Sequence, residues 1–138
     1  MAHLCVLNPL DSTLDVHLSD GQLLATPESM GAFGCTWSGI RGVVGVCEGR
    51  YRFTVRLLRT LPVNVPPHIH GTDSTPGAAL GVSFMHTDVA LLGEVPGSWG
   101  YASNGTKRTD GSTPEPYGLP FGIGNEVRAL GAVLANKL

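Results

Sequence analysis

The sequence has few charged residues, few cysteines and no long hydrophobic run. Only 14% of its 138 residues are charged, whereas about a quarter are charged in a typical soluble domain. Too few charged residues are therefore present to form many solvated helix faces, and strands and loops are favoured. The three cysteines show no Cys-x-x-Cys spacing, which argues against a disulfide framework and a zinc site. No apolar stretch reaches the length of about 18 residues that spans a bilayer, so no membrane segment is expected.

The charge is nearly balanced. Nine Lys and Arg residues against eleven Asp and Glu residues give a net charge of −2. A basic field over the whole molecule, of the kind that holds nucleic acid, is thereby excluded. Any RNA contact must be local or come from regions outside this chain. The cysteine usage and the absence of an export signal favour an intracellular, reduced protein.

Short alternating runs between 19 glycines and 10 prolines predict an all-β fold, an antiparallel β-sandwich forming one domain over 1–138. The clearest predicted strand covers 51–59, where Phe53 and Val55 should lie on a buried face. The Asn104-Gly105 pair predicts a turn. Loops are expected over 61–77 and 104–116, and further strands over 13–18, 22–25, 32–37, 43–47, 80–85, 98–102 and 126–135.

Two histidines offer the most direct alternative to a non-enzymatic protein. His68 and His70 lie two apart after a proline, as in a cupin metal motif, and on an extended segment both would project to one side. Asp73 lies three residues after His70, and His86 is the only later histidine, so the ligand set is incomplete. We therefore expect no metal or cofactor, and a cupin-like enzyme centred on His68 and His70 is kept as the alternative.

No other catalytic pattern is present. The sequence lacks a Gly-x-Ser-x-Gly elbow and both glycine-rich phosphate loops, so we expect no enzyme. A second alternative is local RNA contact through four closely spaced cations: Arg50, Arg52, Arg56 and Arg59.

A partner surface is predicted where aromatic and basic residues gather. Trp99 and Tyr101 share one face of a predicted strand, and the following loop carries Lys107 and Arg108. With Tyr117 these side chains make the mixture of anchors and charged donors that is typical of protein interfaces.

The order of several motifs resembles a SPRY domain, and within that family the SPRY domain of the heterogeneous nuclear ribonucleoprotein U group. The resemblance covers about residues 11–135. It is carried by Asp15-Val16-His17-Leu18, Phe33-Gly34-Cys35-Thr36-Trp37-Ser38-Gly39-Ile40-Arg41, Gly49-Arg50-Tyr51-Arg52-Phe53-Thr54-Val55, Leu61-Pro62-Val63, Leu91-Leu92-Gly93-Glu94, Ser98-Trp99-Gly100-Tyr101 and Tyr117-Gly118-Leu119-Pro120-Phe121.

Two departures from the family are visible. Ala79-Leu80-Gly81-Val82-Ser83 stands where the family usually has Arg-Val-Gly-Trp-Ser, and family domains continue through further strands beyond the position of Leu138. We therefore expect an incomplete domain in which the strand over 126–135 lacks its usual partner and forms an exposed apolar edge.

The resemblance implies a non-catalytic module that binds a protein or peptide through the sandwich loops. It also implies a nuclear, ribonucleoprotein-associated protein, with any RNA association made mainly by regions outside this chain.

Overall fold

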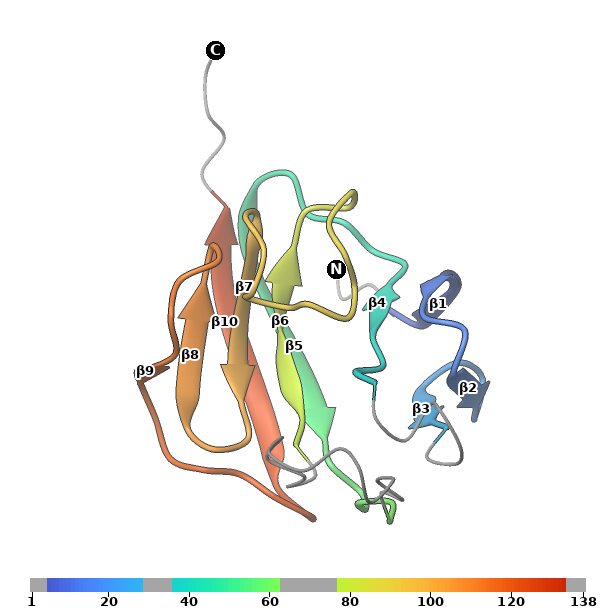
Figure 1. Cartoon of the computed structure of the whole chain (residues 1–138). Coiled ribbons are helices and arrows are strands. Elements are labelled where there is room, and N and C mark those ends of the chain that lie inside the picture. The colour runs from blue at the N-terminus through green and yellow to red at the C-terminus, as the bar shows by residue number, and fades with distance from the viewer. Residues whose placement is uncertain (1–4, 29–35, 63–76, 134–138) are drawn as a thin grey trace.

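The computed structural model describes residues 5–28, 36–62 and 77–133. Within these ranges every regular element is a strand and every strand pairing is antiparallel, which confirms the predicted all-β fold. Figure 1 shows a sandwich-like arrangement, in which the β5–β10 pair crosses the sheet β6-β7-β8-β9 as a second layer and the smaller pairs β1–β4 and β2–β3 lie to one side. The strands are β1 (Leu7–Ser12), β2 (Val16–Ser19), β3 (Leu24–Pro27), β4 (Ile40–Gly42), β5 (Gly49–Arg56), β6 (Ala79–Ser83), β7 (Ser98–Ala102), β8 (Thr106–Thr109), β9 (Glu115–Pro116) and β10 (Glu126–Val133).

β5 and β10 pair with each other as a two-stranded antiparallel ribbon. All eight residues of β10 have a partner in β5, and the second edge of β10 has no strand partner among the described residues, so the predicted open edge is present there. The predicted strand over 51–59 ends at Arg56. Phe53 is only half-buried and Val55 is 42% exposed. In a two-stranded ribbon each strand has a neighbour on one side only, so fewer side chains cover it than in a wide sheet.

The N-terminal strands differ from the predicted ones. β1 is not among the predicted strands, and Pro9 within it lacks the N–H that a regular ladder needs. The register between β1 and β4 is irregular between Leu7 and Ser12, and Pro9 lies within that stretch. β2 begins at Val16 rather than at Thr13, and the predicted strand over 43–47 is irregular backbone. The predicted strand over 32–37 lies largely outside the described residues.

The predicted loop over 104–116 is wrong in part, because it contains β8 and β9. Its Asn104-Gly105 turn is confirmed. Gly105 has a φ of +88°, and a Cβ there would lie 2.5 Å from the carbonyl oxygen of Gly118. Glycine is therefore required at this turn both for its backbone conformation and for the close approach of the chain after β9.

Apolar side chains are unusually accessible. No hydrophobic side chain among the described residues is buried, and the buried polar ones are Asp15 and Ser98. Specific polar contacts must therefore contribute a large share of the interactions that hold the strands and loops in place.

No helix in the described ranges is long and apolar enough to cross a membrane.

Arg41, at the centre of β4, makes the most extensive of these polar contacts. Its guanidinium forms an ion pair with Asp11 at 2.7 Å and donates to Ser83 Oγ at 3.1 Å. It also donates to the carbonyl oxygens of Met85 at 2.9 Å and Thr87 at 2.6 Å. One side chain thus joins β1, β4, β6 and the segment that follows β6.

Candidate functional site

Three of the five predicted partner-binding residues lie together on the four-stranded sheet. Lys107 of β8 is the register partner of Tyr101 of β7. The ring of Tyr117, just after β9, contacts the Tyr101 ring edge-on at a centroid distance of 5.6 Å, and the Lys107 ammonium lies 5.1 Å from the Tyr117 ring centroid. We call Tyr101, Lys107 and Tyr117 the tyrosine–lysine cluster.

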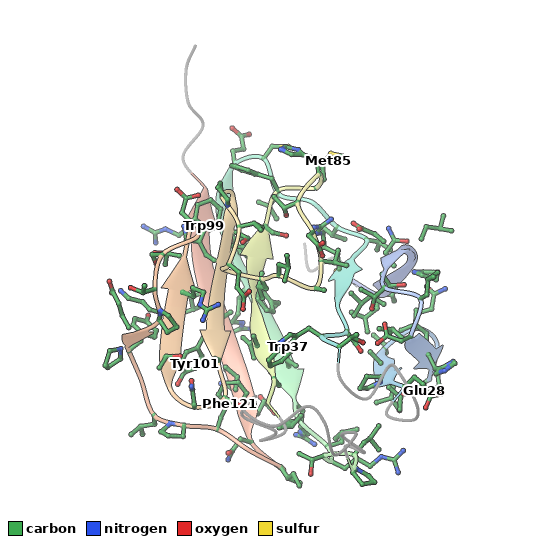
Figure 2. All side chains as sticks on the ribbon, viewed as in Figure 1. Glu28, Trp37, Met85, Trp99, Tyr101 and Phe121 are labelled. Carbon is green, nitrogen blue, oxygen red and sulfur yellow. The ribbon has the colours of Figure 1, made fainter. Side chains whose placement is uncertain are left out.

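Sequence reasoning missed two side chains beside this cluster. The Phe121 ring lies 5.3 Å from that of Tyr101, and Figure 2 shows both near one end of β7. Glu115 lies 3.9 Å from the Lys107 ammonium. Phe121 could have been found from the Tyr-Gly-x-x-Phe motif, but Glu115 carries no signal without the pairing of β8 with β9.

The backbone holds the Tyr117 segment against β7. The Tyr101 hydroxyl donates to the carbonyl oxygen of Leu119, and the backbone N–H of Tyr117 donates to the carbonyl oxygen of Gly105 at 3.0 Å. The Tyr117 side chain is nevertheless 67% exposed. The cluster therefore presents a fixed aromatic ring and a cation to solvent.

Trp99 shares the Tyr101 face of β7 but has different neighbours. Its indole meets the Phe84 ring edge-on at 5.7 Å, and the Phe84 ring in turn stacks on His86 at 6.0 Å. Figure 2 places Trp99 toward the Met85 end of the sheet, away from Tyr101 and Phe121. Two neighbouring aromatic groups thus lie along β7. Trp99 contacts Phe84, which stacks on His86, whereas Tyr101 contacts Tyr117 and Phe121.

Arg108 lies apart from the cluster. As the neighbour of Lys107 in a strand, it projects to the opposite face, where it forms an ion pair with Glu94 at 2.5 Å. Its backbone also lies against Gly93, which has a φ of +81°. Arg108 therefore helps to fix the segment between β6 and β7.

Ser98 anchors the same segment from the start of β7. Its fully buried hydroxyl donates to the carbonyl oxygen of Val95 and accepts from the Gly93 N–H, both at 2.8 Å. Asp110 accepts from the Gly97 N–H at 2.7 Å. These contacts set the direction in which β7 leaves the turn, and so where its aromatic residues point.

The four arginines of the RNA alternative do not form one group. Arg50, Arg52 and Arg56 alternate along one face of β5, whereas Arg59 follows the end of the strand. The register places Arg128 of β10 opposite Thr54, on the face that carries the three strand arginines. Sequence reasoning missed Arg128 because it lies more than 70 residues further along the chain.

Glu126 is the acidic residue on this face. Its carboxylate bonds Arg56 at 3.0 Å and Arg128 at 3.1 Å. Hydrogen bonds from Arg56 first, and then from Arg128, hold the pKa of Glu126 below its usual value. The carboxylate is therefore charged at neutral pH and shared between two cations.

The histidines of the cupin alternative, His68 and His70, lie outside the described residues, as does Asp73. His86 is exposed beside Phe84. Among the residues that the structure describes, no three His, Cys, Asp or Glu side chains come close enough to hold a metal ion.

Asp15 is a buried carboxylate, 5% exposed, that accepts a hydrogen bond from the Ser38 hydroxyl. Burial alone would raise the pKa of Asp15. Hydrogen bonds from Ser38, Thr13 and its own backbone outweigh burial, and the pKa lies below its usual value. The satisfied carboxylate fastens the turn before β2 to the segment before β4, which is a structural role.

In comparisons with known proteins, no family model matches the chain, and no curated protein matches it.

Proposed function

We propose that this protein is a non-catalytic interaction module that binds a peptide or protein partner at the tyrosine–lysine cluster. The observation that carries the proposal is the exposed Tyr117 ring, fixed edge-on against Tyr101 with the Lys107 ammonium above it.

This arrangement supports binding for energetic reasons. Tyrosine side chains have few rotatable bonds, and Tyr101 is already held by its hydroxyl contact with Leu119, so little further entropy is lost when a partner covers the rings. Lys107 supplies a charge-assisted donor at the edge of the aromatic surface. An anchor beside a charged rim is the arrangement found at interface hot spots.

The sequence motifs support assigning the module to the SPRY type, close to the ribonucleoprotein U group. The nuclear location is proposed on the same motifs. The antiparallel sandwich-like fold agrees with this assignment. The cluster includes Tyr117 of the Tyr-Gly-x-x-Phe motif, and Phe121 of the same motif lies beside it against Tyr101.

A displayed random-peptide library selected on the immobilised protein tests the proposal. Selected peptides are then titrated against Tyr117→Ala, Lys107→Ala and a matched control, Arg56→Ala, which removes an exposed cation from the other sheet. We expect Tyr117→Ala to weaken binding at least tenfold, as is typical of an interface anchor. Lys107→Ala should weaken it severalfold, and Arg56→Ala should leave it within twofold.

Backbone amide chemical shifts locate the peptide independently of the variants. Shifts should be concentrated in β7, β8 and the segment around Tyr117. Selected peptides that bind Tyr117→Ala and Lys107→Ala as tightly as the unchanged protein, or that shift only other strands, would contradict the proposal.

A further inference from the structure

The β5–β10 ribbon carries a row of cations on one face. Strand alternation and the β5–β10 register place four arginines there, together with Thr54 and Leu130. We call this surface the arginine face; it consists of Arg50, Arg52, Arg56 and Arg128 with the single acidic residue Glu126.

The arginine face is strongly positive, although the molecule as a whole carries a net negative charge. Its net charge is +3, whereas that of the protein is −2. All four arginines are exposed. Glu126 bonds Arg56 and Arg128, but no carboxylate in the described ranges comes within ion-pair distance of Arg50 or Arg52. Two guanidinium groups are therefore available to bind carboxylates or phosphates in the two-pronged geometry that arginine favours.

The neighbouring side chains favour carboxylates on a peptide over the phosphates of a nucleic acid. Single-stranded nucleic acid is usually held by aromatic stacking beside the cations, but the aromatic residues of β5, Tyr51 and Phe53, lie on the opposite face. The arginine face instead presents Leu130, 80% exposed and directly across from Arg52.

Strand spacing points to the same partner. Alternate residues of a strand lie about 6.7 Å apart, so Arg50 and Arg52 match the spacing of alternate side chains in an extended peptide. An apolar side chain placed between acidic ones would then cover Leu130.

We propose that the arginine face binds an extended acidic segment of a partner protein, in which an apolar residue interrupts a run of Asp and Glu. The site lies on a different sheet from the tyrosine–lysine cluster and does not depend on it. Arg50 and Arg52 bind carboxylates, and Leu130 contacts the apolar residue.

Fluorescence anisotropy with a labelled peptide, Glu-Asp-Glu-Leu-Glu-Asp-Glu, tests this proposal on the full chain. Two further probes are a peptide with Ser in place of Leu and a ten-residue oligouridine. We expect Arg52→Ala to weaken binding of the first peptide about tenfold, as for loss of one charge-assisted contact. The Arg50→Ala, Arg52→Ala double variant should bind more weakly still, and Leu130→Ser should remove the preference for the Leu peptide.

Arg59→Ala is the matched control, because it removes one exposed positive charge that belongs to neither proposed surface, and it should leave peptide affinity within twofold. An equal loss with Arg59→Ala would show that binding follows net charge alone and overturn the proposal. It would also be overturned by absence of peptide binding at millimolar concentration, by unchanged binding in the double variant, or by tighter binding of oligouridine than of either peptide. None of these results depends on whether Tyr117 binds its own partner.

Discussion

Arg41→Ala gives the most direct test of how polar contacts hold this fold together. The Arg41 side chain is 18% exposed, and its ion-pair partner Asp11 is about one-third exposed. The substitution removes that ion pair and the hydrogen bonds to four further acceptors, namely the hydroxyls of Ser83 and Thr87 and the carbonyl oxygens of Met85 and Thr87.

Two reference values guide the expected loss in the free energy of unfolding. Hydrogen bonds to a charged group contribute about 1.5–3 kcal/mol each when well buried, and breaking a fully buried ion pair costs about 3–5 kcal/mol. Here the released acceptors are partly accessible, so water replaces part of what is lost. We therefore expect the free energy of unfolding to fall by about 2–3 kcal/mol.

Urea unfolding followed by tryptophan fluorescence measures this loss, with Arg56→Ala as the matched comparison. Arg56 also forms an arginine–carboxylate pair, but its side chain is 60% exposed, and such pairs contribute less than about 1 kcal/mol. Arg41→Lys keeps the charge without the planar fork and should fall between the two. If Arg41→Ala costs no more than Arg56→Ala, the polar network does not hold β1, β4 and β6 together as we argue.

Two further predictions concern single side chains. Folding lowers the pKa of Asp15. The ionised carboxylate therefore stabilises the fold above its unfolded pKa, and this contribution is lost as the pH falls through the lower, folded value, that is, below about pH 4. Asp15→Asn should reduce this acid sensitivity in urea melts taken between about pH 2 and 6. Phe53→Ala should cost about 2 kcal/mol, less than a fully buried Phe because Phe53 is half-buried, and Val55→Ala should cost less than about 1 kcal/mol. A loss for Phe53→Ala no larger than that for Val55→Ala would contradict the burial that we assign to Phe53.

The strands that could be predicted are those whose apolar residues alternate between strong turn signals. β7 was predicted with its observed bounds, because Ser98–Ala102 follows Gly97 and is followed closely by the Asn104-Gly105 turn. β8 could not be found in this way. Its sequence, Thr-Lys-Arg-Thr, is polar throughout and becomes a strand because β7 pairs with it.

That missed strand also explains why the five predicted site residues do not all lie together. In a loop, Lys107 and Arg108 can point to the same side, but in β8 they must point to opposite faces. Lys107 therefore joins Tyr101 and Tyr117, and Arg108 joins Glu94. The contribution of Arg128 to the arginine face depends likewise on a cross-strand register, which the order of residues alone does not contain.

The two proposed surfaces differ in the charge that they can accept. Lys107 already lies 3.9 Å from Glu115, so the tyrosine–lysine cluster offers aromatic area with only a partly neutralised cation. The arginine face holds +3 in a molecule of net charge −2, which leaves the remainder of the molecule with a net charge of −5. A strongly acidic segment is therefore repelled by most of the molecule and attracted to one ribbon, and this polarity orients its approach. A partner that relies on aromatic contact gains little from that field, so the two surfaces select different segments even when both are exposed.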